Sequence, residues 1–472
     1  MSNVSLFEDV RLGASVGMAK IAAAAIQRLG KGGGTSAPGL VAERIDPSML
    51  SKLTSRLAHG SIVIAGTNGK TTTSRMVADV FTANGMEVVH NRSGSNLVRG
   101  VVSAFVARAS ITGDPGGDVA VIEADEAAFP DIVRLVRPRV ILLNNLFRDQ
   151  LDRYGELDAI SRKWKAALAT VDPSTTVLFN ADDPGLAEIV REIPAATVPF
   201  GLTETRHVLD ELPHAADAGV CRNCGAELEY RTLYVSHLGD WACPACGHAR
   251  PTLEIAGRDI ELDGVESVRM MVDHDGQAAE FEIGVPGMYN AYNLVAAVAA
   301  ARAFDVPRET IDRALRAFRS AFGRIERVSY RDRRLTIALV KNPVGFNEVL
   351  RMLTANTGEL QTRTLIAIND KDADGRDVSW LWDVDFEMLS RGTGVISTTG
   401  IRGSDMANRL KYAGVQADRI SPLPDALSAG LDGFVESIPE GEQGYILPTY
   451  TAMLELRAVL ADRGAVESFW EQ

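Results

Sequence analysis

A heptapeptide rich in glycine and threonine is the feature of this chain that most directly suggests chemistry. Gly66-Thr67-Asn68-Gly69-Lys70-Thr71-Thr72 follows an apolar run at 62–65 and opens a helical pattern over 71–84. Between a strand and a helix, such a loop presents backbone N–H groups and the positive helix end to phosphate oxygens. Lys70 would reach the outer phosphates, and the Thr71 hydroxyl would hold Mg²⁺. The sequence therefore predicts a nucleotide-binding loop, with a purely structural turn as the alternative.

An acidic segment supplies a second candidate for metal binding. Glu123-Ala124-Asp125-Glu126 follows the strand candidate 119–122. A carboxylate at the carboxyl end of a parallel strand, beside a phosphate loop, lies where a bound Mg²⁺ needs a ligand. We expect Glu123 to be that ligand, together with Thr71. The alternative is a solvated acidic loop.

All four cysteines of the chain lie in two Cys-x₂-Cys pairs, Cys221/Cys224 and Cys243/Cys246, with residues 225–242 between them. This spacing matches a zinc-binding pattern. Four thiolates fill a tetrahedral coordination sphere and leave no position for water, so the site is expected to be structural. Because no further cysteine remains, glutamine hydrolysis by a thiol would need another chain. The alternative role of such a ribbon is contact with nucleic acid or protein.

Three further polar residues become candidates for nucleotide binding because the chain contains the predicted nucleotide loop. Asn290 and Asn293 lie at the start of the helix candidate 290–304, which is rich in alanine and valine, and Arg324 lies in the segment 323–327. Side-chain amides can contact a nucleotide base, and a guanidinium group can contact phosphate. We expect all three to belong to an ATP site. The alternatives are a helix N-cap for Asn290 and a surface position for Arg324.

A loop rich in aspartate follows the strand candidate 365–368. It contains Asp370, Asp372, Asp374 and Asp377 and leads to Ser379. Loops at the carboxyl ends of strands often carry function. A calcium loop is one alternative, although the EF-hand order and its terminal glutamate are missing. An acidic turn that caps a helix at Ser379 is the other.

Around these motifs the chain alternates strand and helix patterns, which predicts an α/β fold with parallel sheets and right-handed crossovers. A length of 472 residues suggests about three domains. We expect an N-terminal helix and linker over 1–45 and a central ATPase domain over 46–325 that contains a zinc-ribbon insertion at 205–255. A Rossmann-like α/β domain is expected over 326–472.

The N-terminal helix is predicted over residues 10–29. Leu12, Val16, Ala19, Ala23 and Ile26 fall on one helical face. We expect this face to pack on the body of the protein, and the alternative is a weak contact of the basic helix with a membrane surface.

Composition narrows the class of protein. The net charge of −13 argues against a nucleic-acid partner. No stretch approaches the roughly 20 apolar residues of a transmembrane helix, and the N-terminus lacks the pattern of a secretion signal. We expect a cytoplasmic chain without a transmembrane segment.

Taken together, the motifs resemble those of the Mur ligases. The nucleotide loop and the segments 91–97, 123–126, 180–184 and 289–293 are similar to the ATPase domain that Mur ligases share with folylpolyglutamate synthases and cyanophycin synthetases. The cysteine ribbon and the segments 341–347 and 374–380 narrow the resemblance to the Mur-ligase-like (MurT) subunits of lipid II isoglutaminyl synthase. The resemblance covers roughly residues 10–465.

The resemblance implies a function in peptidoglycan synthesis. Such subunits use ATP and Mg²⁺ to amidate the D-glutamate α-carboxyl of the lipid II stem peptide through an acyl phosphate, and Zn²⁺ would occupy the ribbon. A GatD-like glutaminase forms a heterodimer with this subunit and supplies ammonia with a Cys–His pair, whose third triad member would be Asp377 of this chain. The segment before the ATPase domain is too short for the UDP-binding domain that other Mur ligases carry there. The missing domain fits a lipid-linked substrate, and such a substrate fits a peripheral position at the inner face of the membrane.

Two other functions remain as alternatives. One is an amino-acid-adding ligase of the folylpolyglutamate type. The other is an ATP-dependent zinc-ribbon protein that binds nucleic acid, which would need a basic ribbon; acidic residues instead match the basic ones over 221–248.

Overall fold

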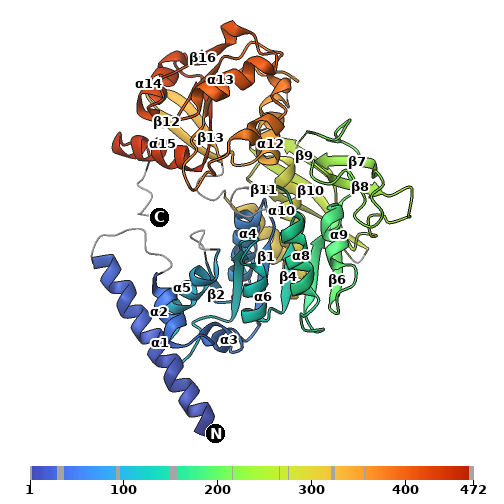
Figure 1. Cartoon of the computed structure of the whole chain (residues 1–472), viewed down its shortest axis with the longest axis vertical. Helices are drawn as coiled ribbons and strands as arrows, with labels where there is room; N and C mark the ends of the chain where they lie inside the picture. Colours follow the sequence, from blue (N-terminus) through green and yellow to red (C-terminus); the bar gives the residue numbers. More distant parts are fainter. Residues whose placement is uncertain are drawn as a thin grey trace.

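A nine-stranded sheet, a six-stranded sheet and a two-stranded hairpin organise the chain. The computed structural model describes residues 3–28, 37–91, 96–148, 157–214, 216–264, 266–274, 276–319, 325–355 and 358–466. Figure 1 shows the six-stranded sheet and its helices above the nine-stranded sheet, and the hairpin at one side of the larger sheet. Within the described ranges, no helix combines the length and apolar composition that crossing a bilayer requires.

The nine-stranded sheet forms the middle of the molecule, in the order β11-β10-β9-β6-β5-β4-β1-β3-β2. From β9 to β2 in this order, every strand pair is parallel. At the other end, β10 is antiparallel to both β9 and β11 and forms an antiparallel edge with them. The strands are β1 (Ser61–Ala65), β2 (Val88–His90), β3 (Val119–Ala124), β4 (Val140–Leu143), β5 (Thr176–Asn180), β6 (Ala196–Leu202), β9 (Ile255–Asp263), β10 (Ser267–His274) and β11 (Gln277–Ile283). The expected parallel sheet is therefore present, with an antiparallel extension.

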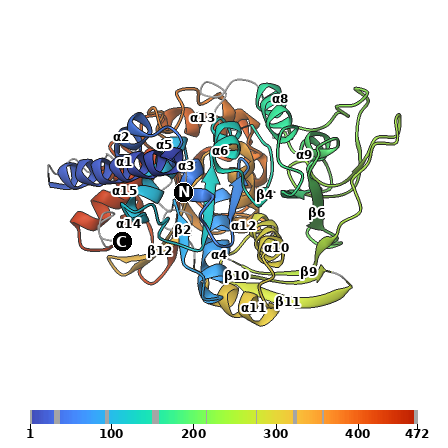
Figure 2. The same ribbon diagram turned by 90° about the horizontal axis from the view of Figure 1, so that it is seen from below.

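Helices cover both faces of this sheet, and each face has its own apolar core (Figure 2). One face carries α4 (Lys70–Ala83), α10 (Met288–Ala303) and α11 (Arg308–Ala317). The other carries α3 (Met49–Thr54), α5 (Val98–Arg108), α6 (Phe129–Val136), α8 (Leu157–Leu168) and α9 (Pro184–Val190).

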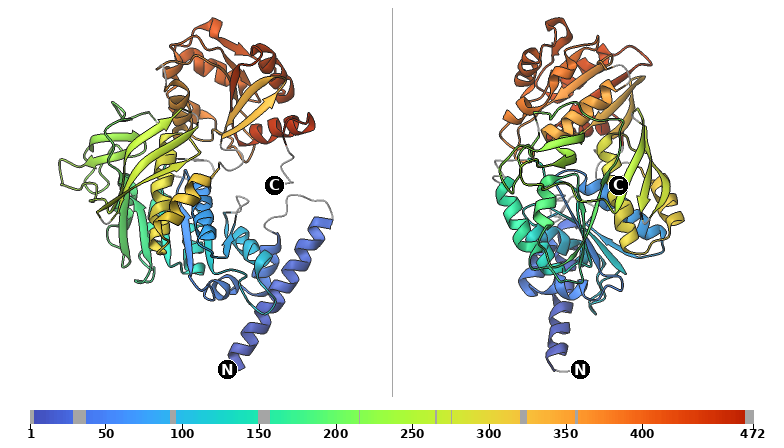
Figure 3. Two further views of the ribbon diagram at one scale, coloured as in Figure 1. Left: turned by 180° about the vertical axis from the view of Figure 1, so that it is seen from behind. Right: turned by 90° about the vertical axis from the view of Figure 1, so that its right-hand side faces the viewer.

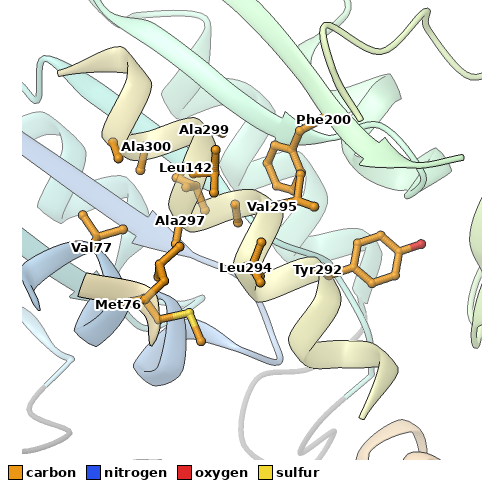
Figure 4. Close-up of a cluster of buried hydrophobic side chains, with 14 of the residues drawn as sticks. Met76, Val77, Leu142, Phe200, Tyr292, Leu294, Val295, Ala297, Ala299 and Ala300 are labelled. Atoms are coloured by element: carbon orange, nitrogen blue, oxygen red, sulfur yellow. The ribbon is translucent and has the colours of Figure 1, made fainter. Parts of the chain in front are cut away.

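Helix α10 is buried on nearly every side, which explains its composition. Residues 294–301 are all buried, as expected for a helix that is apolar all round. Figure 4 shows Val295 and Ala297 of this helix among Met76, Leu142 and Phe200, which come from α4, β4 and β6. Small alanine side chains let α10 lie close to α4, whose first residue is Lys70. The packing thereby fixes the start of α4.

Two N-terminal helices extend the opposite layer, which contains α3 and α5: α1 (Asn3–Arg28) and α2 (Ala37–Ile45). Leu12, Val16 and Ala19 of α1 are buried, as the sequence predicts, whereas Ala23 and Ile26 of the predicted face are only half-buried. Ser15 Oγ donates to Ala42 O at 2.9 Å. The helix begins earlier than expected, and its amino end projects beyond the body (Figures 1 and 3). The expected glycine linker lies outside the described residues.

The hairpin of β7 (Glu229–Val235) and β8 (Leu238–Ala242) lies in the chain between β6 and β9. Because β6 and β9 pair directly, the whole segment 203–254 is an insertion at one sheet position.

The C-terminal sheet has the order β12-β13-β17-β14-β15-β16, in which β12 and β13 are antiparallel and the other pairs are parallel. Its strands are β12 (Ile325–Tyr330), β13 (Arg333–Ala338), β14 (Arg363–Ala367), β15 (Ile396–Thr399), β16 (Ile420–Pro422) and β17 (Gln443–Pro448). Helices α12 (Pro343–Thr354), α13 (Gly403–Tyr412), α14 (Leu427–Ser437) and α15 (Tyr450–Asp462) accompany it, with the 3₁₀ turns η1 (Ser379–Asp383), η2 (Phe386–Leu389) and η3 (Ala417–Arg419).

Candidate functional site

The loop 66–69 connects β1 directly to α4, which is the arrangement expected for a phosphate-binding loop. Gly69 caps α4 with φ +82°, in the left-handed region that favours glycine. A Cβ atom at this position would lie 2.1 Å from Asn293 Oδ1. Gly69 is therefore required by its backbone conformation and by the close approach of Asn293.

Two residues of the loop are held by the segment that follows β4. The Thr67 hydroxyl accepts from Phe147 N and donates to Phe147 O, both at 3.0 Å. Asn68 N donates to Asn145 Oδ1 at 2.8 Å, and Asn145 Nδ2 donates to Asn68 O at 3.1 Å. Sequence reasoning did not assign Asn145; a pair of asparagines directly after a buried strand was the available signal.

Lys70 carries the positive charge of the loop and is buried. Its ammonium group donates to Gly66 O and, at 3.2 Å, to Thr67 O, and lies 3.1 Å from Glu126 Oε2. The side chains of Lys70 and Glu126 are only 8% and 4% exposed. A buried ammonium beside a loop of N–H groups can bind the outer phosphates of a nucleotide.

Thr71 and Glu123 lie together, as the sequence predicts. Thr71 Oγ1 donates to Glu123 Oε1 at 3.2 Å. The backbone of Glu123 is fixed by Asn91, whose side chain exchanges two 2.9 Å hydrogen bonds with Glu123 N and O. Neighbouring ligands of an octahedral Mg²⁺ ion lie about 3 Å apart, so this oxygen pair fits the ion. Thr72, the last residue of the motif, is buried within α4.

Asn290 and Asn293 lie at the amino end of α10 and are both buried. Asn293 Nδ2 donates to Asn290 Oδ1 at 2.9 Å, and Asn290 Nδ2 donates to Pro286 O at 2.6 Å. Asn293 Oδ1 accepts from Thr73 Oγ1 at 3.2 Å, next to Gly69. The structure thus places both residues against the start of α4. Arg324 lies outside the described residues.

The C-terminal domain reaches the nucleotide loop through Asn342, at the N-cap of α12. Its Nδ2 donates to Asn68 Oδ1 at 2.9 Å, while its Oδ1 accepts from Gly345 N at 2.8 Å. The same residue therefore caps a helix and contacts the loop. In the sequence, Asn342 belongs to the segment 341–347 that carries the family resemblance, but it had no assigned role there.

The four cysteines converge on one point. All four Sγ atoms lie within 4.8 Å of one another, with Cys221–Cys246 at 3.7 Å and Cys224–Cys243 at 3.4 Å. Tetrahedral zinc with Zn–S bonds of about 2.3 Å separates its sulfur atoms by about 3.8 Å, so the cluster fits this ion.

Each cysteine pair lies on a tight turn, as expected for a zinc ribbon. Gly225 N donates to Cys221 O at 2.7 Å, and Gly247 N donates to Cys243 O at 3.0 Å. A hydrogen bond from the Asn223 side chain lowers the pKa of the Cys246 thiol to about 6, whereas burial raises the pKa of the neighbouring Cys221 thiol.

Asp182 anchors the ribbon to the sheet. It is fully buried and accepts from Arg250 Nη1 at 2.8 Å, Tyr292 OH at 2.7 Å and Leu202 N at 3.0 Å. Burial raises the pKa of Asp182 to about 6, even though Arg250 opposes the shift. The ribbon backbone adds a bond from Gly239 N to Asp182 O at 3.0 Å.

A second set of contacts joins the ribbon region to the segment after β4. Arg148 N donates to Asp217 Oδ2 at 2.7 Å, and Asp217 N donates to His237 Nδ1 at 3.2 Å. Asp183 Oδ2 accepts from Leu146 N at 2.8 Å and lies 3.6 Å from His237 Nε2. The ribbon region thus contacts the segment that holds Thr67 and Asn68.

Asp377 lies on an exposed loop of the C-terminal domain, before η1. Its Oδ1 accepts from Ser379 N at 2.8 Å, and this hydrogen bond lowers the pKa of the carboxyl group. The turn that follows approaches the middle domain through an Arg148–Asp383 ion pair of 3.7 Å. Asp377 therefore presents a charged carboxylate to the surface and takes no part in the hydrogen bonds of the nucleotide loop described above.

Comparison with protein families agrees with the two α/β units. Residues 64–217 match the Mur ligase middle domain, and residues 339–453 match the MurT ligase C-terminal family. The chain is 33% identical over 446 residues to the lipid II isoglutaminyl synthase (glutamine-hydrolyzing) subunit MurT of Streptococcus pneumoniae, covering 93% of this chain and 95% of the relative. The corresponding subunit of Staphylococcus aureus strain COL is 32% identical, covering 90% and 94%.

Solved structures show the same fold at low identity. A pseudomurein peptide ligase type C from Methanothermus fervidus aligns with a TM-score of 0.66 at 17% identity, covering 85% of this chain and 78% of that chain. MurF from Acinetobacter baumannii aligns with a TM-score of 0.63 at 16% identity, covering 89% and 80%.

Proposed function

Because the chain belongs to the MurT family of Mur-ligase-like subunits of lipid II isoglutaminyl synthase, which act in peptidoglycan biosynthesis, we propose how its residues serve this reaction. The observation that carries the proposal is the convergence of Lys70, Thr71 and Glu123 at the end of β1 and β3. A buried cation, a hydroxyl and a carboxylate at a strand–loop–helix junction suit phosphoryl transfer from ATP.

The proposed substrate is the D-glutamate α-carboxyl of the lipid II stem peptide. One carboxylate oxygen attacks the γ-phosphorus of ATP, ADP leaves, and an acyl phosphate forms. Ammonia then attacks the carbonyl carbon, inorganic phosphate leaves, and loss of a proton gives the amide of D-isoglutamine. Phosphorylation is needed because a free carboxylate has no adequate leaving group.

In this scheme Lys70 exchanges its contact with Glu126 for contacts with the phosphate oxygens and stabilises the charge that develops there. Residues 66–69 present backbone N–H groups to the phosphates. Thr71 and Glu123 would hold Mg²⁺, which neutralises phosphate charge when bound. Asn290 and Asn293 keep the start of α4 in place beside the nucleotide, and Arg324 is proposed as a further phosphate contact.

We assign the four cysteines to a structural Zn²⁺ site. The ribbon would hold the segment after β4, and through it the loop residues Thr67 and Asn68, in position.

The source of ammonia is proposed to be a glutaminase subunit of the GatD type, bound in a heterodimer. All four cysteines lie in the cluster, so the nucleophilic thiol must come from that partner. Asp377 would orient the partner's catalytic histidine, since its carboxylate is charged and exposed. With lipid II as the substrate, the chain would act in the cytoplasm, peripherally at the inner membrane face.

The purified chain, given ATP, Mg²⁺, ammonium and lipid II with a free D-glutamate α-carboxyl, tests the ligase proposal. We expect conversion of acid to amide, read from the product mass, together with release of ADP. A preparation that binds ATP and contains zinc, yet leaves the acid unchanged even with the glutaminase subunit and glutamine present, would contradict it.

A further inference from the structure

Helix α1 has a second apolar face, which points to solvent. Val10, Met18 and Ile21 are 67%, 51% and 64% exposed, and Ala14 and Ala25 are also exposed. Steps of four, four, three and four residues place these five on one line along the helix. We call this line the α1 stripe. It lies on a different side from Leu12, Val16 and Ala19, which pack on the body.

The stripe continues onto the body through Ile111, in the turn after α5. Ile111 is 65% exposed. A Cβ atom added at Gly13 would lie 2.5 Å from Ile111 O, so the backbone of this turn touches the helix beside the stripe. Large apolar side chains that gather in this way on a surface mark an interaction site more often than single ones do.

Positive charge borders the stripe. Glu8 and Asp9 precede the stripe, but residues 10–28, which carry it, contain Arg11, Lys20 and Arg28 and no acidic residue, although the whole chain has a net charge of −13. By helical spacing, Arg11 lies beside Met18 on one side of the stripe and Lys20 lies on the other, and Arg28 lies one step beyond Ala25. The Nε of Arg11 donates to Ile45 O at 2.7 Å. Arg11, Lys20 and Arg28 are exposed. A local basic border on an acidic protein favours an anionic surface.

We propose that the α1 stripe docks the protein on an anionic lipid surface. An apolar line bordered by cations is the pattern of helices that lie in the membrane interface, with apolar groups among the acyl chains and cations at the headgroups. Figures 1 and 3 show α1 at the edge of the molecule with its amino end projecting, so a flat surface can reach it.

A second copy of the chain fits the stripe less well than a lipid surface does. Two stripes packed together would bring Lys20 and Arg28 of both copies into one interface, where like charges repel. The inference deepens the proposed function and rests on it for its purpose, which is to hold the enzyme beside a lipid-linked substrate.

Vesicle sedimentation of the full chain tests the proposal without lipid II. We expect binding to vesicles that contain phosphatidylglycerol and weaker binding to pure phosphatidylcholine. Ile21→Glu or Met18→Glu should weaken binding at least about tenfold, because an ionised group replaces a buried apolar one. Lys20→Gln should weaken binding about fivefold on phosphatidylglycerol and leave phosphatidylcholine binding unchanged.

Val208→Glu serves as the matched control, since Val208 is also an exposed apolar residue, at 40%, but lies outside α1. It should bind as the unmodified chain does. Absence of vesicle binding, or equal binding by Ile21→Glu, would overturn the proposal. So would a dimer in solution that Ile21→Glu dissociates while vesicles remain unbound. Melting temperatures close to that of the unmodified chain would exclude misfolding as the cause.

Amidation in detergent, where no membrane is present, separates this inference from the proposed function. Ile21→Glu should amidate lipid II there at the normal rate. Vesicle binding without amidation by the unmodified chain would overturn the proposed function but support the docking surface. Amidation without vesicle binding would support the proposed function but overturn the docking surface.

Discussion

The side chain of Asn342 donates a 2.9 Å hydrogen bond to Oδ1 of Asn68, 274 residues away in sequence and in the middle of the nucleotide loop. The bond joins the C-terminal domain to the residues that would bind ATP. Asn68 is also held by Asn145, so its position depends on both domains. A nucleotide bound at this loop would therefore lie beside a direct contact between the two domains.

We expect Asn342→Ala to lower kcat/KM for ATP-dependent amidation about five- to tenfold. The change removes one hydrogen bond to the loop and the N-cap of α12, each of which is worth about 1 kcal/mol. Asn342→Asp retains the cap and should restore stability without restoring full activity. Steady-state kinetics and thermal melting separate the two effects. Gln361→Ala, a change of an exposed polar residue in the same domain, is the control. Equal activity of Asn342→Ala and this control would show that the contact of Asn342 with Asn68 does not support catalysis.

Replacement of Lys70 should stop ATP turnover. Lys70→Met keeps most of the side-chain volume but removes the cation beside the buried carboxyl group of Glu126, so a loss of about 3 kcal/mol of stability is expected as well. The double variant Lys70→Met/Glu126→Gln should recover much of that stability and remain inactive. Phosphate release and thermal melting measure the two quantities, with the exposed Lys163→Met as control. Full activity in either Lys70 variant would exclude its assignment to phosphate binding.

Asp377→Asn should separate the two nitrogen sources. Amidation driven by glutamine and the glutaminase subunit should fall at least about hundredfold, since an amide orients a catalytic histidine poorly. Amidation with added ammonium should be unchanged, because Asp377 lies apart from the hydrogen bonds of the nucleotide loop. The nearby exposed Asp372→Asn is the control. Equal losses with both nitrogen sources would place Asp377 in the ligase site instead.

Loss of one cysteine should unfold the ribbon and disturb the loop that it supports. We expect Cys224→Ser to lower zinc content and to lower the melting temperature by more than about 5 °C. ATP turnover should also fall, because Asp217 and His237 contact the segment after β4. Metal analysis and calorimetry provide the readouts. Glu227→Ser, an exposed change in the same ribbon, should preserve all three properties, and an unchanged zinc content in Cys224→Ser would refute the structural-zinc assignment.

Asp182 should give stability a specific pH dependence. Its pKa is raised from 3.8 to about 6 by burial, so the folded protein holds this proton more tightly than the unfolded chain does. Raising the pH from 4 to 6 therefore lowers the free energy of unfolding of the unmodified chain, by up to about 3 kcal/mol from this group. Asp182→Asn cannot titrate, so the free energy of unfolding of the unmodified chain, minus that of the variant, should fall as the pH rises over this range. Urea unfolding at several pH values measures it; a difference that stays constant or grows would contradict the assignment.

Local patterns in the sequence were sufficient to place most elements. The apolar run at 140–143 coincides with β4, and the helix expected at 71–84 is observed as Lys70–Ala83, with Gly85 at φ +83° directly after its cap. Short buried strands and glycine-terminated helices depend on neighbouring residues, so one sequence reveals them. The cysteine spacing likewise predicted the cluster.

Relations between distant segments could not be predicted in this way. The pairing of β6 with β9 and the contact of Asn342 with Asn68 depend on the tertiary fold. The sequence predicted burial of α1 on the side of Leu12 and Val16. The exposure of its second apolar face could be recognised only from the structure, which shows which side packs on the body. Asn145 was adjacent to a predicted strand, yet its side chain has no local pattern that identifies its partner.

The position of the ribbon also bears on the fate of the newly made chain. Strand β6 finishes its pairing only when β9 arrives, after the whole segment 203–254 has been synthesised. Until then one border of the sheet offers unpaired N–H and C=O groups, which other chains can add to as further strands. Since the ribbon is anchored on Asp182, next to this border, its metal would help to bring β9 into place. A ribbon that lacks its metal is therefore expected to leave this border unpaired for longer, which favours aggregation of the new chain.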